Sequence, residues 1–116
     1  MTTNNSIDKI DHCPALITIS AISGKWKTRI LWLLRTEELG FNDLRRRLRR
    51  VSAKVLTDQL RELEADGILY LNPVSKQGVQ YSRYGFTHYG KTLIPILNEL
   101  GSWGLRHEER NDTNGP

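Results

Sequence analysis

The sequence has a single cysteine, Cys13, only three histidines and no long apolar run. One cysteine excludes a disulfide within the chain and a cysteine-cluster metal site, while a reactive thiol or a link between two chains stays open. No stretch approaches the roughly 18 consecutive apolar residues of a membrane helix, and the amino terminus lacks the features of a secretory signal. We therefore expect a cytoplasmic protein with no membrane partner, metal or cofactor.

Signals of catalysis are equally scarce. His12, His88 and His107 do not have the spacing of metal ligands, and no third partner accompanies the neighbours His12 and Cys13. The glycine-rich fingerprints of phosphate and dinucleotide binding are absent. The sequence therefore does not predict an enzyme.

Positive charge, by contrast, is concentrated in one segment. The chain of 116 residues carries a net charge of +4, yet seven cations and two anions lie between Asn42 and Arg61, a local charge of +5. The segment Leu44–Lys54 reads LRRRLRRVSAK. A patch of this kind favours an anionic partner, although a run of arginines is also compatible with a merely solvated surface.

The length and the 38% apolar content fit one domain. We place it at residues 9–110, between polar tails at 1–8 and 111–116. Apolar periodicity predicts a mainly α-helical fold with a small β-hairpin. The expected helices span residues 14–22, 24–35 with Ser23 as cap, 42–48, Ser52 to Gly67, and 87–109 with Thr87 as cap. Pro95 should kink the last helix or move its start to a later residue.

Only three residues, Arg49 to Val51, separate the third and fourth expected helices, which is the spacing of a helix-turn-helix. The fourth helix has an N-cap serine at Ser52, and its inner stripe is expected to comprise Val55, Leu56, Leu60 and Leu63. Strands at 68–74 and 79–84, joined by a turn at 75–78, would form a wing beside it. The sequence thus predicts a winged helix-turn-helix.

This arrangement predicts binding to double-stranded DNA, with the fourth helix in the major groove. The expected phosphate contacts are Arg45, Arg46, Arg47, Arg49 and Arg50. The expected base-reading face comprises Ser52, Ala53, Lys54, Thr57, Asp58 and Arg61. Asp58 would either accept a hydrogen bond from a cytosine or pair with Lys54 or Arg61. The expected wing contacts are Lys76, Gln77 and Arg83.

Several motifs together resemble the HxlR family of winged helix-turn-helix bacterial transcription regulators. They are CP at 13–14, GKW at 24–26, FNDLRR at 41–46, KVLTDQLRELEADGIL at 54–69, FTHYG at 86–90 and GSWG at 101–104. The resemblance implies a MarR-like homodimer, formed by the first and last helices, that binds a two-fold operator. The expected dimer contacts are Ile10, Leu16, Ile19, Leu93, Leu97, Leu100 and Trp103. In some members, oxidants, electrophiles or small metabolites control DNA binding.

The chain departs from the family pattern in three places. The turn, which often carries proline or glycine, contains Arg49 and Arg50. Ala53 follows the capping serine where proline or histidine is common. The returning strand reads GVQYSRY, so a wing of different shape is expected.

Cys13 resembles the redox-sensing thiol of some family members. A thiol just before a helix start feels the positive end of the helix dipole, and His12 and Lys9 nearby favour the thiolate further. The alternative is a half-buried cysteine that packs as a small apolar residue. Trp26, Trp32 and Trp103 are expected to fill the core or the dimer interface, the alternative for Trp103 being a ligand pocket between the last and first helices.

The hypothesis for function is therefore a homodimeric, sequence-specific DNA-binding regulator, expected to be a repressor, that acts on a palindromic operator. A thiol reagent or small molecule is its expected inducer. The alternative is a winged-helix interaction module that binds protein or RNA without recognising an operator.

Overall fold

The computed structural model describes residues 12–114, so the expected tail at 1–8, the expected dimer contact Ile10 and residues 115–116 lie outside the described residues. Five α-helices, one short 3-10 helix and one two-stranded antiparallel hairpin make up this part of the chain. They are α2 (Pro14–Ile22), α3 (Lys27–Leu34), α4 (Phe41–Leu48), α5 (Ala53–Ala65), β1 (Leu69–Lys76), β2 (Val79–Phe86), the short 3-10 helix η1 (Gly90–Leu93) and α6 (Ile94–Asn114). The winged helix-turn-helix fold is confirmed.

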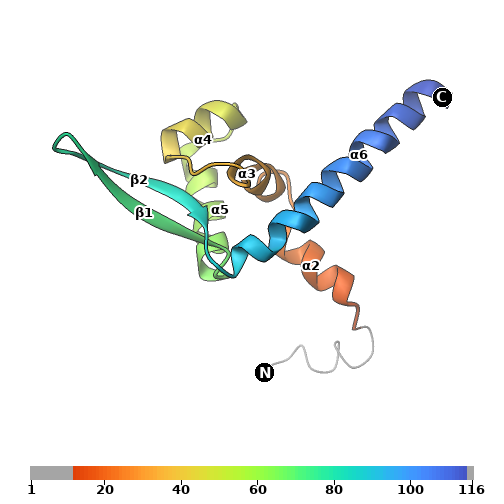
Figure 1. Ribbon diagram of the computed structural model, residues 1–116, viewed down its shortest axis with the longest axis horizontal. Helices are drawn as coiled ribbons and strands as arrows, with labels where there is room; N and C mark the ends of the chain where they lie inside the picture. Colours follow the sequence, from red (N-terminus) through yellow and green to blue (C-terminus); the bar gives the residue numbers. More distant parts are fainter. Residues whose placement is uncertain (1–11, 115–116) are drawn as a thin grey trace.

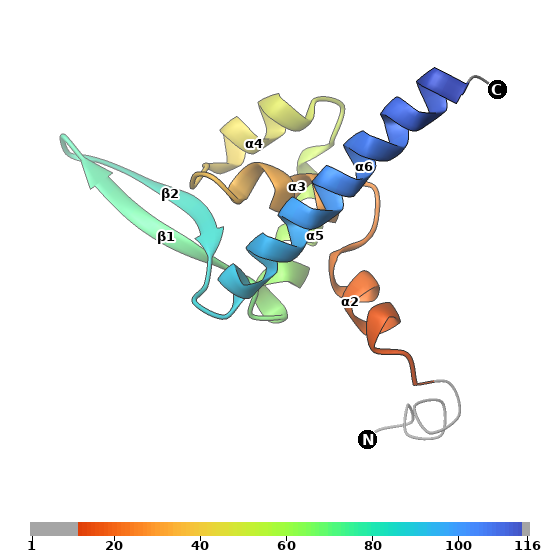
Figure 2. The same ribbon diagram turned by 45° about the vertical axis from the view of Figure 1, so that its right-hand side comes forward.

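The hairpin and α6 project from opposite sides of a helical body, and α2 lies on the same side as α6 (Figures 1 and 2). The radius of gyration is 17.0 Å, compared with about 13 Å for a globular domain of this length. The core lies where α3, α4, α5 and the hairpin base meet. Its fully buried side chains are Ile30, Leu31, Leu44, Leu56, Leu60, Leu63 and Leu97.

Both ends of α5 form as the sequence predicts. The Ser52 hydroxyl accepts a hydrogen bond from the Val55 N–H at 3.1 Å. At the other end Gly67 adopts a φ of 75°, and the N–H groups of Gly67 and Ile68 donate to the carbonyls of Glu64 and Leu63. Local chemistry alone therefore fixes the bounds of this helix.

The expected start of the second helix is wrong. Gly24 has a φ of 119°, which interrupts the helix, and α3 begins only at Lys27 with Trp26 in the N-cap position. Ser23 instead ends α2, where its N–H donates to the Ile19 carbonyl at 2.7 Å.

The last helix also differs from expectation. The Thr87 hydroxyl accepts a hydrogen bond from the Gly90 N–H at 2.8 Å, so it supports the start of the short η1 helix and not that of α6. Pro95 then lies in the first turn of α6, where the backbone N–H that proline lacks would have no partner within the helix. Of the two expected effects of Pro95, a kink or a later helix start, the later start is therefore correct. The helix continues to Asn114, past the expected end at Glu109, because no glycine or proline interrupts residues 105–114.

The hairpin is longer than expected, with only Gln77 and Gly78 left as the turn. Both have positive φ, 54° and 78°, which suits the right-handed twist of a two-residue hairpin. In the part of the chain that the structure describes, no helix is both long and apolar enough to span a membrane.

Candidate nucleic-acid interface

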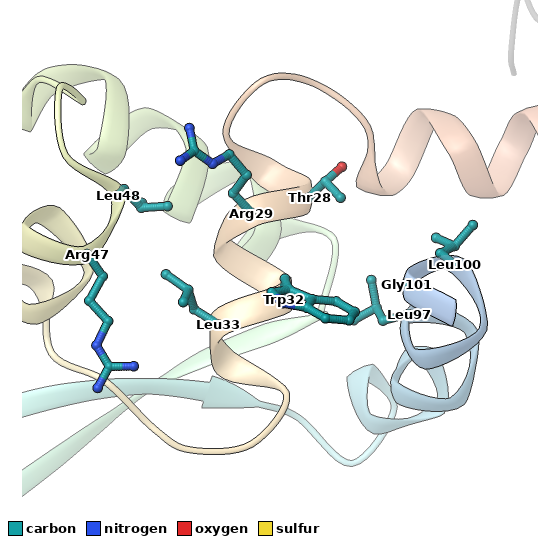
Figure 3. A pocket seen from close by; sticks show the side chains of 9 residues that line it. All are labelled: Thr28, Arg29, Trp32, Leu33, Arg47, Leu48, Leu97, Leu100 and Gly101. Carbon is teal, nitrogen blue, oxygen red and sulfur yellow. The ribbon is translucent and has the colours of Figure 1, made fainter. Parts of the chain in front are cut away.

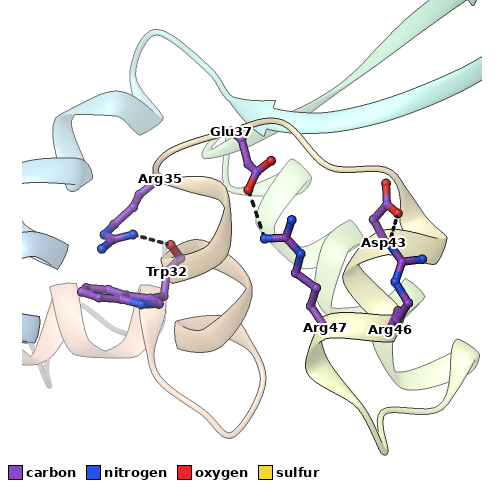
Figure 4. A network of polar contacts seen from close by, with 6 residues as sticks. All are labelled: Trp32, Arg35, Glu37, Asp43, Arg46 and Arg47. Carbon is purple, nitrogen blue, oxygen red and sulfur yellow. Dashed lines mark hydrogen bonds and ion pairs between the residues drawn. The ribbon is translucent and has the colours of Figure 1, made fainter.

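The arginines of α4 lie on its exposed face, and each has a partner within the protein. The Arg46 guanidinium contacts the Asp43 carboxylate at 2.6 Å, and the Arg47 guanidinium contacts Glu37 at 3.0 Å (Figure 4). Arg45 donates from Nε to the Val51 carbonyl at 3.3 Å and so ties α4 to the turn. Exposed ion pairs of this kind contribute little to stability, so a phosphate can replace either carboxylate at low cost.

The turn between α4 and α5 has an unfavourable backbone. Arg49 has φ 58° and ψ −176°, and Arg50 has φ 22°, both in regions that residues with a side chain rarely adopt. Among the described ion pairs neither arginine has a carboxylate partner. The turn therefore holds two exposed cations on a strained backbone, a combination that is concentrated at functional sites.

The exposed face of α5 begins directly after this turn. Ser52, Ala53, Lys54 and Arg61 are exposed, and Thr57 and Asp58 are half-buried. The Lys54 ammonium lies 2.8 Å from the Asp58 carboxylate, one helical turn later. Of the two roles expected for Asp58, pairing with Lys54 is the one that the geometry supports in the absence of DNA.

Val55 does not belong to the inner stripe of α5, contrary to expectation. Its side chain is 37% exposed, whereas Leu56, Leu60 and Leu63 are fully buried. At 100° per residue these three leucines define the core-facing side, and Val55 lies about 100° away from their centre. The apolar side chain therefore stands on the exposed face near the helix start, where it is suited to contact a thymine methyl group.

A carboxylate that no sequence motif singles out holds the base of the wing. Glu38 accepts hydrogen bonds from the Tyr70 hydroxyl at 2.8 Å and from the Asn72 amide at 3.3 Å. The hydrogen bond to Glu38, followed by desolvation, raises the pKa of Tyr70 above its ordinary value. Leu39 and Tyr84 add a backbone bridge, with N–H to carbonyl distances of 3.2 and 2.8 Å. The link before α4 thus fixes where the hairpin points.

The expected wing residues Lys76, Gln77 and Arg83 are all exposed. Lys76 and Gln77 lie at the tip, and the Arg83 guanidinium lies 5.5 Å from the centre of the Tyr81 ring. The hairpin tip is well separated from the helical body in both views (Figures 1 and 2).

Apolar side chains remain exposed on α2 and α6. They are Leu16, Ile17 and Ile19 on α2, and Ile96, Leu100, Trp103 and Leu105 on α6. Two of the expected dimer contacts differ: Leu97 is 1% exposed and Leu93 is half-buried, because both pack in the core of their own chain. Trp26 is half-buried, Trp32 is partly exposed, and Trp103 stacks on His107.

Cys13 is the N-cap residue of α2 and a free, half-buried thiol. No side-chain capping hydrogen bond accompanies it. Within residues 12–114 no three side chains of histidine, cysteine, aspartate or glutamate come together as a metal site.

Comparison with known proteins agrees with this geometry. The family described as HxlR-like helix-turn-helix matches residues 21–112. The HTH-type transcriptional regulator YdeP of Bacillus subtilis is 36% identical over 92% of this chain and 83% of its own. The redox regulator HypR in its reduced form is 32% identical with a TM-score of 0.78, covering 87% of this chain and 99% of HypR. A solved HTH-type transcriptional regulator, YtcD, is 34% identical with a TM-score of 0.72, and the match covers 84% of this chain and 98% of YtcD.

Proposed function

Because this chain belongs to the HxlR-like helix-turn-helix family, whose members regulate transcription and are not enzymes, we propose that it is a homodimeric repressor of a palindromic DNA operator, acting in the cytoplasm. The observation that carries this proposal is the exposed face of α5, which follows directly on the arginines of α4 and the turn. In the proposed complex α5 lies in the major groove, and the arginines and the wing contact the backbone on either side.

The division of roles on this surface follows from reach and geometry. Arg61 is exposed on α5 and has a guanidinium suited to the O6 and N7 atoms of guanine. Arg46 lies on α4, away from the groove-facing helix, and is suited to a phosphate. Arg61→Ala should therefore cost about 1–3 kcal/mol of discrimination between operator and random DNA. Arg46→Ala should weaken binding to both duplexes and lower the salt slope by about 0.9 for each phosphate that Arg46 neutralises.

The unpartnered apolar faces of α2 and α6 support a dimer. Leu16 on α2 and Trp103 on α6 are 58% and 60% exposed. The helices α2 and α6 both lie on the side of the molecule opposite the hairpin (Figure 1). A two-fold axis through this region pairs like surfaces and gives the two α5 helices the symmetry of a palindrome. The described elements other than α2 and α6 belong to the DNA-binding unit. The mode of action that the fold supports is therefore occupation of a promoter.

A charge placed in this apolar face tests the dimer. Because both side chains are exposed in the single chain, Leu16→Glu and Trp103→Glu should leave the fold intact and separate the protomers. Sedimentation velocity should then show a monomer with unchanged circular dichroism. A dimer that persists in both variants would place the interface elsewhere.

Cys13 gives the proposed repressor a thiol switch. The support is its place at the start of α2, one of the two helices assigned to the dimer, together with the similarity to HypR, a redox regulator. Oxidation or alkylation of Cys13 would alter the packing of α2 and with it the separation of the two α5 helices.

The experiment that tests the function is fluorescence anisotropy of the reduced protein on the duplex upstream of its own gene and on a scrambled duplex, at rising salt. An operator binder keeps a preference of roughly 10³ or more at near-physiological salt. Equal binding to both duplexes that disappears with salt would favour an interaction module instead. Repetition after mild oxidation, with Cys13→Ser as the matched control, tests the thiol switch separately.

A further inference from the structure

Above its buried base, the hairpin is attached to the helical body by the link that precedes α4. In that link Leu39 is buried, and its backbone forms a bridge with Tyr84 of β2. The next residue, Gly40, comes so close to β2 that a Cβ there would lie 3.2 Å from the Ser82 carbonyl oxygen. The link therefore holds β2 by its backbone at residues 82–84.

The strand β1 is held by a side chain of the same link. Glu38 is half-buried, and its carboxylate accepts hydrogen bonds from the Tyr70 hydroxyl at 2.8 Å and from the Asn72 amide at 3.3 Å. Tyr70 pairs in register with Gly85 of β2, and a Cβ on Gly85 would come 2.7 Å from the Glu38 Oε2 atom. Glycine at this position thus makes room for the carboxylate. Since hydrogen bonds to an ionised group are roughly twice as strong as neutral ones, Glu38 fixes β1 at two points.

Beyond this attachment, packing does not fix the direction of the hairpin. A cavity of about 370 Å³ lies between the start of α4 and the hairpin, with Phe41, Leu71 and Tyr81 among the residues that line it. Among the described residues, no side-chain hydrogen bond or ion pair joins residues 73–81 to a helix. The outer half of the hairpin therefore has room to tilt unless it is held at its base.

The helices of the body, by contrast, are held by direct packing. The Trp32 ring of α3 faces a cavity of about 420 Å³ that Arg29 and Arg47 border, and it points toward α6 (Figure 3). A Cβ on Gly101 of α6 would come 2.7 Å from the Cζ3 atom of this ring, so the two helices are in contact. The direction of the hairpin depends on hydrogen bonds to a degree that the positions of these helices do not.

A small tilt at the base moves the tip of the hairpin a long way. Five residues separate Asn72 from Gln77 in the turn, which is about 16 Å at the rise of an extended strand. A tilt of about 15° would therefore move the tip by about 4 Å, more than the length of a hydrogen bond. The exposed side chain of Lys76 lies at this tip.

We propose that Glu38 is a positioning residue for DNA binding, which holds the hairpin at the angle at which Lys76 reaches the DNA backbone beside the α5 site. The carboxylate itself does not touch DNA. It acts through Tyr70 and Asn72 on the direction of the hairpin. This role on DNA rests on the proposed function, whereas the holding of the hairpin stands on the contacts of Glu38 alone.

The first test measures the direction of the hairpin without DNA. Residual dipolar couplings of the backbone N–H groups in the reduced full chain should fit one rigid body that includes the hairpin. In Glu38→Ala the couplings of residues 73–82 should no longer fit that body, while those of the helices persist. Glu38→Gln keeps an oxygen for the Tyr70 hydroxyl, and its amide can donate to the Asn72 side-chain oxygen, so it should behave as the unmodified chain does. Unchanged couplings in Glu38→Ala would overturn the proposal.

The second test is a double-mutant cycle on operator DNA. In the unmodified chain, Lys76→Ala should lower the slope of log K against log salt by about 0.9 for each phosphate that Lys76 neutralises. Glu38→Ala should lower the slope by the same amount although it removes an anion, and Lys76→Ala should then add nothing. Glu38→Gln, which removes the same charge, should keep the unmodified slope. Arg46→Ala on α4 is the matched control and should lower the slope equally with and without Glu38.

Tyr70→Phe gives a second variant in which Glu38 and its charge stay in place. It removes one of the two hydrogen bonds and should reproduce the loss of slope in smaller measure. A mere defect of folding would instead weaken binding and leave the contribution of Lys76 to the slope intact.

Two results on DNA would refute the role of Glu38. If Lys76→Ala lowers the slope equally with and without Glu38, the contact of the tip does not depend on this carboxylate. If Lys76→Ala changes nothing in the unmodified chain, the tip does not contact DNA. If the chain prefers no operator over random DNA, the proposed function fails, and the dipolar couplings still decide whether Glu38 holds the hairpin.

Discussion

Replacement of Arg49 by glycine should make the protein more stable while it weakens DNA binding. Arg49 has φ 58° and ψ −176°, a conformation that is essentially confined to glycine and costs a residue with a side chain about 1–3 kcal/mol. Glycine removes this strain but gains conformational freedom in the unfolded chain, which takes back about 0.5–1 kcal/mol. The net expectation for Arg49→Gly is a gain of about 1 kcal/mol, or roughly 4 °C in Tm.

Arg49→Ala is the control, because it removes the same charge and keeps the strained backbone. Both variants should lower the salt slope of DNA binding equally, by about 0.9 per protomer if Arg49 holds one phosphate. Only Arg49→Gly should raise the denaturant midpoint, measured at one fixed protein concentration because a dimer's stability depends on it. Equal midpoints for the two variants would refute the argument that Arg49 is strained in the folded state.

Two further predictions concern α6 and the wing. Gly104→Ala should stabilise the protein by up to about 1 kcal/mol through helix propensity, since a Cβ there meets nothing within 4 Å. Gly101→Ala should not show this stabilisation, because its Cβ would collide with the Trp32 ring. Thermal unfolding compares the two, and equal Tm values would mean that Trp32 moves aside freely. Glu38→Ala should lower the pKa of Tyr70 toward its ordinary value, so tyrosinate absorbance appears at lower pH, and should speed hydrogen exchange at the hairpin base. Unchanged titration and exchange would show that Glu38 does not anchor the wing.

The helix-turn-helix is predictable because its signals are local. Ser52 can cap only a helix that begins immediately after it, and Gly67 provides the left-handed residue that ends the same helix. The basic run is likewise visible directly in the chain, and its exposure follows from the buried positions of Leu44 and Leu48 on either side. These features depend on neighbours within a few residues, so no knowledge of the tertiary fold is needed.

Sequence reasoning fails where one residue has two plausible environments. Val55 is apolar and so is expected to face inward, yet the leucines three and four residues apart already fill the core-facing side of α5. Leu97 is expected on the dimer surface because its helix is apolar on several sides. The position of α6 against α3 decides which side is covered, and no periodicity contains that information.

The sequence by itself determined the class of the protein, the caps of α5 and the concentration of positive charge beside it, since each follows from short-range chemistry. Only the tertiary structure decided that Glu38 holds the wing, that Glu37 pairs with Arg47, and that Trp32 faces a cavity bordered by two arginines. In each case the partners come from separate elements, Tyr70 from β1, Arg47 from α4 and Gly101 from α6. Their distances are set by how the helices and the hairpin pack, which the order of residues along the chain does not display.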